Sequence, residues 1–205
     1  MPIASVRDVD AGVESKNGQP ILTIPDAAAW EQWLVANHTG HPGVWLKLAK
    51  KGAPSATVSY AGALDVALCY GWIDGQKGAY NGEYWLQRFT MRGPRSVWSQ
   101  VNRDKVAALI EAGRMRPAGQ AAVDKAMADG RWAAAYAPQS KATVPPDLQA
   151  ALEATHAAAA AWATWNSTNR YAVLYRVHNA KRPETRARRI AQFVDMLIRD
   201  EKLYP

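Results

Sequence analysis

The sequence predicts an α+β fold, in which a small antiparallel sheet with a central hairpin packs against helices and a C-terminal helical subdomain follows. Three observations predict it: strand-like alternation around Asn81-Gly82, helical spacing of apolar residues on both sides of that stretch, and a proline-rich segment near residue 140. The predicted parts are a loose N-terminal leader at residues 1–20, an α+β domain at 21–136, a linker at 137–146 and a helical subdomain at 147–205.

The first elements follow from local patterns. Residues 21–24 indicate a short strand, and Asp26 is a typical N-cap for a helix that runs through Asn37. Residues 44–48 alternate as a second strand. Ser59 is then expected to cap a helix that stops at Gly71, because glycine favours the end of a helix.

The pairing register of the following hairpin decides which side chains meet. A two-residue turn at Asn81-Gly82 places Asp74 opposite Phe89, whereas a three-residue loop centred on Asn81 places Asp74 opposite Arg88. A slip of one residue reverses every side chain, so the two registers exclude each other. We favour the second register, which puts Trp72, Asp74 and Arg88 on one face.

Helical patterns fill the rest of the chain. One helix opens at Ser96 or Ser99 and closes at Gly113, and the next begins with Pro117 and ends near Gly130. Beyond the linker, the predicted helices cover residues 146–155, an alanine-rich stretch to 165, residues 167–181 and residues 183–199.

The hairpin supplies the candidate ligand site. An Asp74–Arg88 pair beside Trp72 would form a polar island among aromatic rings, which either fixes the sheet as a buried ion pair or floors a pocket for an anionic or planar ligand. In the second interpretation, Arg92 and Arg95 lie at the entrance of this pocket. The candidate ligand-binding residues are Trp72, Asp74, Arg88, Arg92, Arg95 and Trp98.

Positive charge is concentrated in two segments. The chain has 25 Lys+Arg and 18 Asp+Glu, a net charge of +7, while residues 86–120 and residues 165–200 each carry +5. These segments form either solvated helix faces or a surface that binds anions, since arginine grips carboxylates and phosphates with two parallel hydrogen bonds. In the last predicted helix, we expect Arg182, Arg186 and Arg189 to form a basic outer surface.

Composition and spacing exclude several classes of protein. With 48% hydrophobic and 21% charged residues, the 205-residue chain is an ordinary globular one, and no apolar run approaches the ~20 residues of a membrane span. Cys69 is the single cysteine, which rules out an internal disulfide and suits a buried thiol in a cytoplasmic protein. His38 and His41 are three residues apart, but His156 and His178 are far away and there is no cysteine cluster, so we expect no metal site. The sequence has no glycine-rich phosphate loop, and we expect no cofactor.

The central motifs also resemble a known family. The run Gly71-Trp72-Ile73-Asp74-Gly75, followed by Arg88-Phe89-Thr90 and by Pro94-Arg95-Ser96-x-Trp98-Ser99, resembles the YdeI/OmpD-associated family of bacterial proteins. The resemblance continues through residues 113–119 and 180–190, and spans roughly residues 20–200. It implies bacteriocin protection and stress tolerance, without an established reaction or catalytic residues. Residues 90–93 depart from the expected Thr-Pro-Arg-Arg by one proline and one arginine.

Three functions are compatible with these features. The favoured one is a non-catalytic protein that binds a small anionic ligand or an acidic partner at the Trp/Asp/Arg pocket. The alternatives are nucleic-acid binding through the two arginine-rich segments and an enzyme that uses Asp74 as an acid or base. No recognised nucleic-acid motif supports the second, and the third requires Asp74 to face a cleft.

The charge leads to one prediction about the mode of protection. A chain of net charge +7 repels cationic antimicrobial peptides within the screening length of ~8 Å, so we expect no sequestration of such peptides. Isothermal titration calorimetry with a cationic peptide should show no stoichiometric binding. Tight one-to-one binding would contradict this prediction.

Overall fold

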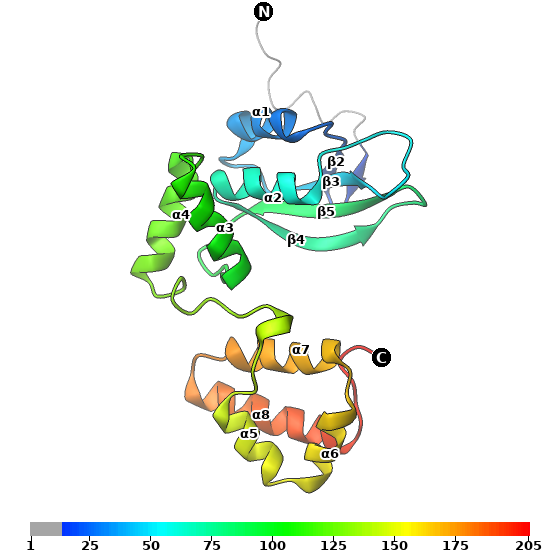
Figure 1. Ribbon diagram of the computed structural model, residues 1–205, viewed down its shortest axis with the longest axis vertical. Helices are drawn as coiled ribbons and strands as arrows, with labels where there is room; N and C mark the ends of the chain where they lie inside the picture. Colours follow the sequence, from blue (N-terminus) through cyan, green and yellow to red (C-terminus); the bar gives the residue numbers. More distant parts are fainter. Residues whose placement is uncertain (1–13) are drawn as a thin grey trace, which may run out of the picture. The chain divides into compact units, whose positions relative to one another are not determined.

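The computed structural model describes residues 14–205, which fall into two compact units (Figure 1). Unit 1 comprises the described residues up to Trp98 together with Asn102–Ala135, and unit 2 comprises Ser99–Val101 and Tyr136–Pro205. The predicted α+β class is confirmed. Among the described helices, none combines the length and the apolar character needed to cross a bilayer.

Unit 1 contains a five-stranded sheet in the order β1-β2-β3-β5-β4. Its strands are β1 (Ser15–Lys16), β2 (Gln19–Leu22), β3 (Val44–Ala49), β4 (Trp72–Ala79) and β5 (Tyr84–Met91). Strands β2 and β3 are parallel and the other neighbours are antiparallel, so the predicted small antiparallel sheet is mixed at this one pairing. The reason is the helix between β2 and β3, which returns the chain for a parallel pairing.

Four helices accompany this sheet: α1 (Ala27–Asn37), α2 (Tyr60–Cys69), α3 (Gln100–Glu111) and α4 (Pro117–Ala128). The predicted N-caps of the first two are confirmed. The Asp26 carboxylate accepts from Ala29 N at 2.8 Å, and the Ser59 hydroxyl accepts from Gly62 N at 3.1 Å. Each bond satisfies an amide that the helix itself leaves unbonded.

Unit 2 is helical. After the short helix η1 (Gln139–Lys141) it contains α5 (Pro146–Glu153), α6 (His156–Thr164), α7 (Ser167–His178) and α8 (Pro183–Ile198). These helices bury a core of their own, which includes Leu148, Leu152, Trp165, Val173, Val177, Phe193 and Leu197. The four long helices match the predicted ones to within about three residues at each end, as expected where the apolar spacing is regular.

The structure contains regular elements within both the predicted leader and the predicted linker. Residues 1–13 of the leader lie outside the described residues, while Ser15–Lys16 and Gln19–Leu22 are the paired strands β1 and β2. The proline-rich linker at 137–146 contains η1 and the first residue of α5.

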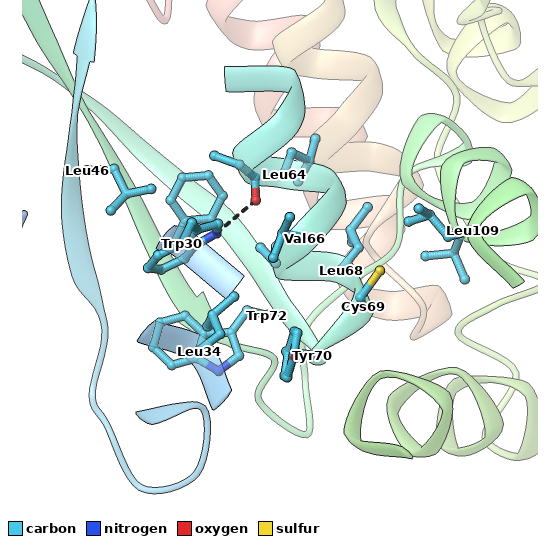
Figure 2. Close-up of a cluster of buried hydrophobic side chains, with 14 of the residues drawn as sticks. Trp30, Leu34, Leu46, Leu64, Val66, Leu68, Cys69, Tyr70, Trp72 and Leu109 are labelled. Atoms are coloured by element: carbon cyan, nitrogen blue, oxygen red, sulfur yellow. Dashed lines mark hydrogen bonds between the residues drawn. The ribbon is translucent and has the colours of Figure 1, made fainter. Parts of the chain in front are cut away.

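The core of unit 1 lies between the sheet and the helices (Figure 2). Val44, Leu46 and Leu48 of β3 point into it, so we call this the inner face of the sheet. Figure 2 shows Trp30 of α1 beside Leu46 and α2, and its indole Nε1 donates to Ala63 O at 3.1 Å. The outer face carries the alternate residues of the same strands, such as Trp45.

The register of the β4–β5 hairpin differs from the favoured one. Asp74 lies opposite Phe89, which is the alternative register, and the pairing shifts by one residue between Asp74 and Lys77. The buried amide of Gln87 holds this bulge, since its Nε2 donates to Gly75 O at 3.0 Å and to Gln76 O at 3.3 Å. The favoured register is therefore wrong: the hairpin contains a bulge that no turn signal encodes.

The end of α2 and the start of α4 pack in backbone contact. Gly71 adopts a φ of +72°, which turns the chain after α2, and a side chain there would meet Ala118 O at 2.9 Å. A Cβ at Gly119 would overlap the carbonyl of Cys69 and lie 2.8 Å from Leu68 O. Arg116 N donates to Cys69 O at 3.1 Å across the same junction. Only glycine allows this approach.

A single methyl group tests the junction. We expect Gly119→Ala to lower the free energy of unfolding by roughly 1–3 kcal/mol, because its Cβ would push apart two backbone segments. The gain in helix propensity, about 1 kcal/mol, offsets only part of that loss. Urea unfolding measures the change. Gly82→Ala is the matched control, since a Cβ there meets nothing within 4 Å, and equal stabilities of the two variants would contradict the prediction.

Candidate functional site

The six candidate ligand-binding residues do not converge on one hollow. Trp72 and Asp74 share the inner face with Phe89, while Arg88 points to the outer face, where its Nε donates to Gln19 Oε1 at 2.7 Å. The expected Trp72–Asp74–Arg88 island is therefore wrong. Its premise was the other hairpin register, and the bulge reverses the relative direction of the strands' side chains.

Trp72 belongs to the core. Its side chain is 0% exposed, its Nε1 donates to His38 O at 3.0 Å, and its ring contacts Trp30 and Trp33 edge to face. Such burial leaves no surface for a ligand. Asp74 lies near the solvent and accepts a hydrogen bond from the Tyr60 hydroxyl at 2.7 Å.

The other three predicted residues lie further along the chain. The Arg92 guanidinium stacks 3.5 Å above the Trp98 ring and donates to Val97 O at 3.2 Å. Trp98 is buried and meets the ring of Trp132 at 4.9 Å. Arg95 is exposed in the turn after β5. Arg92 and Trp98 therefore form a packed cation–π pair within unit 1.

The predicted basic surface of the last helix is largely turned inward. Arg186 Nη1 donates to Val177 O at 2.8 Å, and Arg189 Nη1 donates to Arg176 O at 2.6 Å. Both carbonyls belong to the last turn of α7, where a cation is favourable. Arg182 alone of the three predicted residues is exposed. The expectation of an outer surface is wrong for Arg186 and Arg189, because helix α7 binds them.

Arg186 also pairs with the start of α5. Its Nε and Nη2 donate to the two carboxylate oxygens of Asp147, the latter at 2.8 Å. These hydrogen bonds hold the pKa of Asp147 below its ordinary value. One arginine therefore ties α8 to both α5 and α7.

Arginines of the 86–120 segment are bound internally as well. Arg116 Nη2 pairs with Glu31 Oε1 at 2.7 Å, and the Tyr70 hydroxyl donates to the same oxygen at 3.1 Å. The bond from Arg116 lowers the pKa of Glu31, whereas burial and the bond to Glu31 raise the pKa of Tyr70. This cluster fastens α1 to the junction of α2 and α4. Arg116 thus uses its charge to hold these elements together.

A cluster of cations that the sequence analysis missed lies on the outer sheet face. Lys16 Nζ lies 5.1 Å from the centre of the Trp45 ring, Arg88 is directly opposite Trp45 on β5, and Lys47 is two residues further along β3. We call Lys16, Lys47 and Arg88 the outer cationic cluster. Strands β3 and β5 are neighbours, so the diagonal positions of Lys47 and Arg88 lie roughly 7–8 Å apart, a span that one multiply charged anion can bridge.

The scaffold of this cluster is rigid. Trp45 is 2% exposed and its Nε1 donates to Lys16 O at 3.1 Å, which fixes β1 against the face. Lys47 Nζ lies 4.7 Å from the ring of Tyr80 and 4.5 Å from that of Tyr84. Gly78 leaves room for Lys16, since a Cβ there would lie 2.8 Å from Lys16 Nζ. Lys16 and Lys47 thus each contact aromatic rings of this face.

The cluster carries unbalanced charge. Within residues 14–205 none of its three members forms an ion pair. The nearby Glu14 carboxylate accepts from the Tyr80 hydroxyl at 2.6 Å, and this bond raises the pKa of Tyr80. One sign of this cluster was visible in the sequence: Trp45 and Lys47 occupy alternate positions of one strand and therefore share a face. Lys16 lay in the segment that was expected to be a leader.

Groups that could support metal or nucleophilic chemistry are sparse in the described part of the chain. No set of three or more His, Cys, Asp and Glu side chains gathers there in a way that could hold a metal ion. Cys69 is buried, and burial raises the pKa of its thiol, which keeps it in the unreactive protonated form at neutral pH.

Comparisons with protein families divide the chain into two stretches. Residues 141–199, which include α5 to α8, match the family model described as "Bacteriocin-protection, YdeI or OmpD-Associated". The predicted resemblance is confirmed there. Residues 22–122, which hold the central motifs, match a separate model described as a domain of unknown function (DUF8412). No curated protein and no solved structure matches the chain.

The inward arginines yield a prediction for unit 2. We expect Arg186→Gln to lower its free energy of unfolding by roughly 1–3 kcal/mol, mainly through the lost bond to Val177 O. The Asp147 pair is half exposed and adds about 1 kcal/mol or less. Unfolding in urea, followed by circular dichroism, measures the loss.

The control and the pH dependence follow from the same contacts. Arg188→Gln removes an equal charge from an exposed position of α8 and should change stability by less than about 0.5 kcal/mol. Because the pKa of Asp147 is lowered in the folded state, its contribution is full above about pH 4 and is lost as the pH falls through that lowered pKa. The effect of Arg186→Gln should therefore shrink in acid. Equal effects of the two variants would contradict the inward role.

Proposed function

We propose that this chain, which carries a domain of the YdeI/OmpD-associated, bacteriocin-protection family at residues 141–199, is a non-catalytic bacterial binding protein that contributes to tolerance of envelope or bacteriocin stress. It acts in the cytoplasm by binding a small anionic ligand or an acidic partner. The binding site is the outer cationic cluster of unit 1, which replaces the Trp/Asp/Arg pocket expected from the sequence.

The observation that carries this proposal is a set of three cations around one buried indole. Lys16, Lys47 and Arg88 lie on one sheet face, and none of them has an ion-pair partner within residues 14–205. Like charges at this spacing repel each other, and an anion that bridges them relieves the repulsion. The cluster is therefore expected to bind a ligand more tightly in its negatively charged form than in its neutral form.

Arg88 is the best placed of the three to select the ligand. Its Nε is engaged by Gln19 Oε1, and Gln19 Nε2 in turn donates to Pro42 O at 2.9 Å. The guanidinium is therefore oriented, and within the described residues its terminal nitrogens have no other hydrogen-bond acceptor. A carboxylate or phosphate that receives these nitrogens gains a charge-assisted contact without the cost of ordering the side chain.

The same structure argues against a long nucleic acid as the partner. In the two arginine-rich segments that suggested it, Arg116, Arg186 and Arg189 are engaged in internal bonds, so the free charge is smaller than the count of basic residues indicates. Phosphate contacts along a duplex need many free cations on one surface. A compact group of three suits a small anion or a short acidic segment better.

Titration with simple anions tests the proposal. Inorganic pyrophosphate and a short polyglutamate peptide should bind, and Arg88→Ala should weaken binding about 10- to 100-fold, as expected when a charge-assisted contact is lost. Isothermal titration calorimetry at two salt concentrations measures both affinities, which should fall with added salt.

The matched control is Arg95→Ala, which removes an exposed arginine of unit 1 from outside the cluster. It should bind like the parent. Cells that express the Arg88→Ala variant should also survive a bacteriocin challenge less well than cells that express Arg95→Ala. Identical affinities and survival for the two variants would refute the outer cationic cluster as the functional site.

A further inference from the structure

A hollow of about 390 Å³ opens on the inner side of the sheet, at the end remote from the α2–α4 junction. It lies between the loop at residues 50–59, the ends of β3 and β5, and the first residue of α2. Its lining is mainly small or aromatic and includes Gly52, Ala53, Ser55, Ala56, Tyr60 and Trp85. For comparison, about 150 Å³ of apolar space suffices for benzene.

The loop spans the hollow as a fixed arch. Lys50 N donates to Glu83 O at 2.8 Å, Val58 N donates to Ile24 O at 2.8 Å, and the Tyr84 hydroxyl donates to Ser55 O at 3.3 Å. The arch is therefore attached at both ends and in the middle. Between these points it carries small residues such as Gly52 and Ala53, which leave the space beneath it unfilled. The hollow is therefore formed by the hydrogen-bonded conformation of the loop.

The wall opposite the arch is an aromatic corner. The rings of Trp85 and Tyr60 are 6.0 Å apart and inclined at 47°, and the bond from Tyr60 to Asp74 orients the phenol. Trp85 is only half-buried, and its Nε1 finds no acceptor within the described residues. A partly exposed indole with an unused donor is a poor core residue but a good contact for a ring.

We propose that this hollow binds a planar aromatic ligand of one or two rings that carries a hydrogen-bond acceptor at its edge. The inclined rings of Trp85 and Tyr60 offer stacking and edge contacts, Trp85 Nε1 supplies the donor, and the small side chains of the arch leave space for the ring's thickness. Lys77 Nζ, 4.5 Å from the centre of the Trp85 ring, adds positive charge, so an electron-rich acceptor is favoured over a cation. This site is on the opposite face of the sheet from the outer cationic cluster and does not depend on it.

Nuclear magnetic resonance of the full chain tests the proposal with indole-3-carboxamide as the probe and cyclohexanecarboxamide as its non-aromatic counterpart. The aromatic amide should shift the Trp85 indole N–H resonance with a Kd of about 1 mM or tighter, in line with a ligand of this size. The cyclohexane amide should bind at least about tenfold more weakly, because it cannot stack. The Trp85 resonance is assigned by its loss in Trp85→Phe.

Two variants locate the binding without removing any aromatic group. Ala53→Phe fills the hollow and should abolish the shift, whereas Lys51→Phe adds the same ring to an exposed position of the same loop and should not. Circular dichroism confirms that both remain folded. No shift at Trp85 up to several millimolar, or equal binding by the two variants, would overturn the inference. Arg88→Ala should retain the shift, which separates this result from that of the anion titration.

Discussion

Gln87 closes the bulge in the central hairpin, and the directions of the side chains on both strands depend on that closure. Its buried amide donates to Gly75 O and Gln76 O, two carbonyls beside the shift in the β4–β5 ladder. A buried amide left without an acceptor costs roughly 1–3 kcal/mol, so the buried Gln87 side chain is stable only where it meets these carbonyls, and the two bonds stabilise the bulge. With the bulge in place, Asp74 faces the helices while Arg88 faces away from them.

This single irregularity gives the sheet two chemically different faces. The inner face holds the tryptophan-rich core and, at its end, the aromatic corner of Tyr60 and Trp85. The outer face has a small apolar centre at Trp45 with cations around it. Had Asp74 and Arg88 met across the hairpin, they would have neutralised each other. With the two apart, Arg88 forms no ion pair within residues 14–205, and the proposal of an anionic ligand rests on this.

Much of the fold could be predicted from the sequence because it depends on local signals. The caps at Asp26 and Ser59, the break at Gly71 and the four helices of unit 2 are each encoded within a few residues. The hairpin register is different, since it depends on Gln87, whose partners lie eleven and twelve residues away. Turn chemistry at Asn81-Gly82 contains no information about a bulge further along the strand.

The candidate site could be predicted less well, for a related reason. Arginine spacing on α8 indicates which residues share a stripe but not that the carbonyls of α7 bind Arg186 and Arg189. A count of charges therefore overstates how much of a basic segment is free. The outer cationic cluster assembles Lys16, Lys47 and Arg88 from three strands, and no window of the sequence contains all of them.

The two family models match different stretches of the chain, and these stretches correspond closely to the two units of the structure. The bacteriocin-protection match covers α5 to α8, whose arginines Arg186 and Arg189 hold the helices of unit 2 together. Of the outer cationic cluster, Lys47 and Arg88 belong to the stretch of unit 1 that matches the other model, and Lys16 precedes it. Within residues 14–205, the three cations of the outer sheet face form no ion pair. If the outer cationic cluster recognises an acidic molecule, as we propose, the protective role needs unit 1 as well as the residues that match the bacteriocin-protection model.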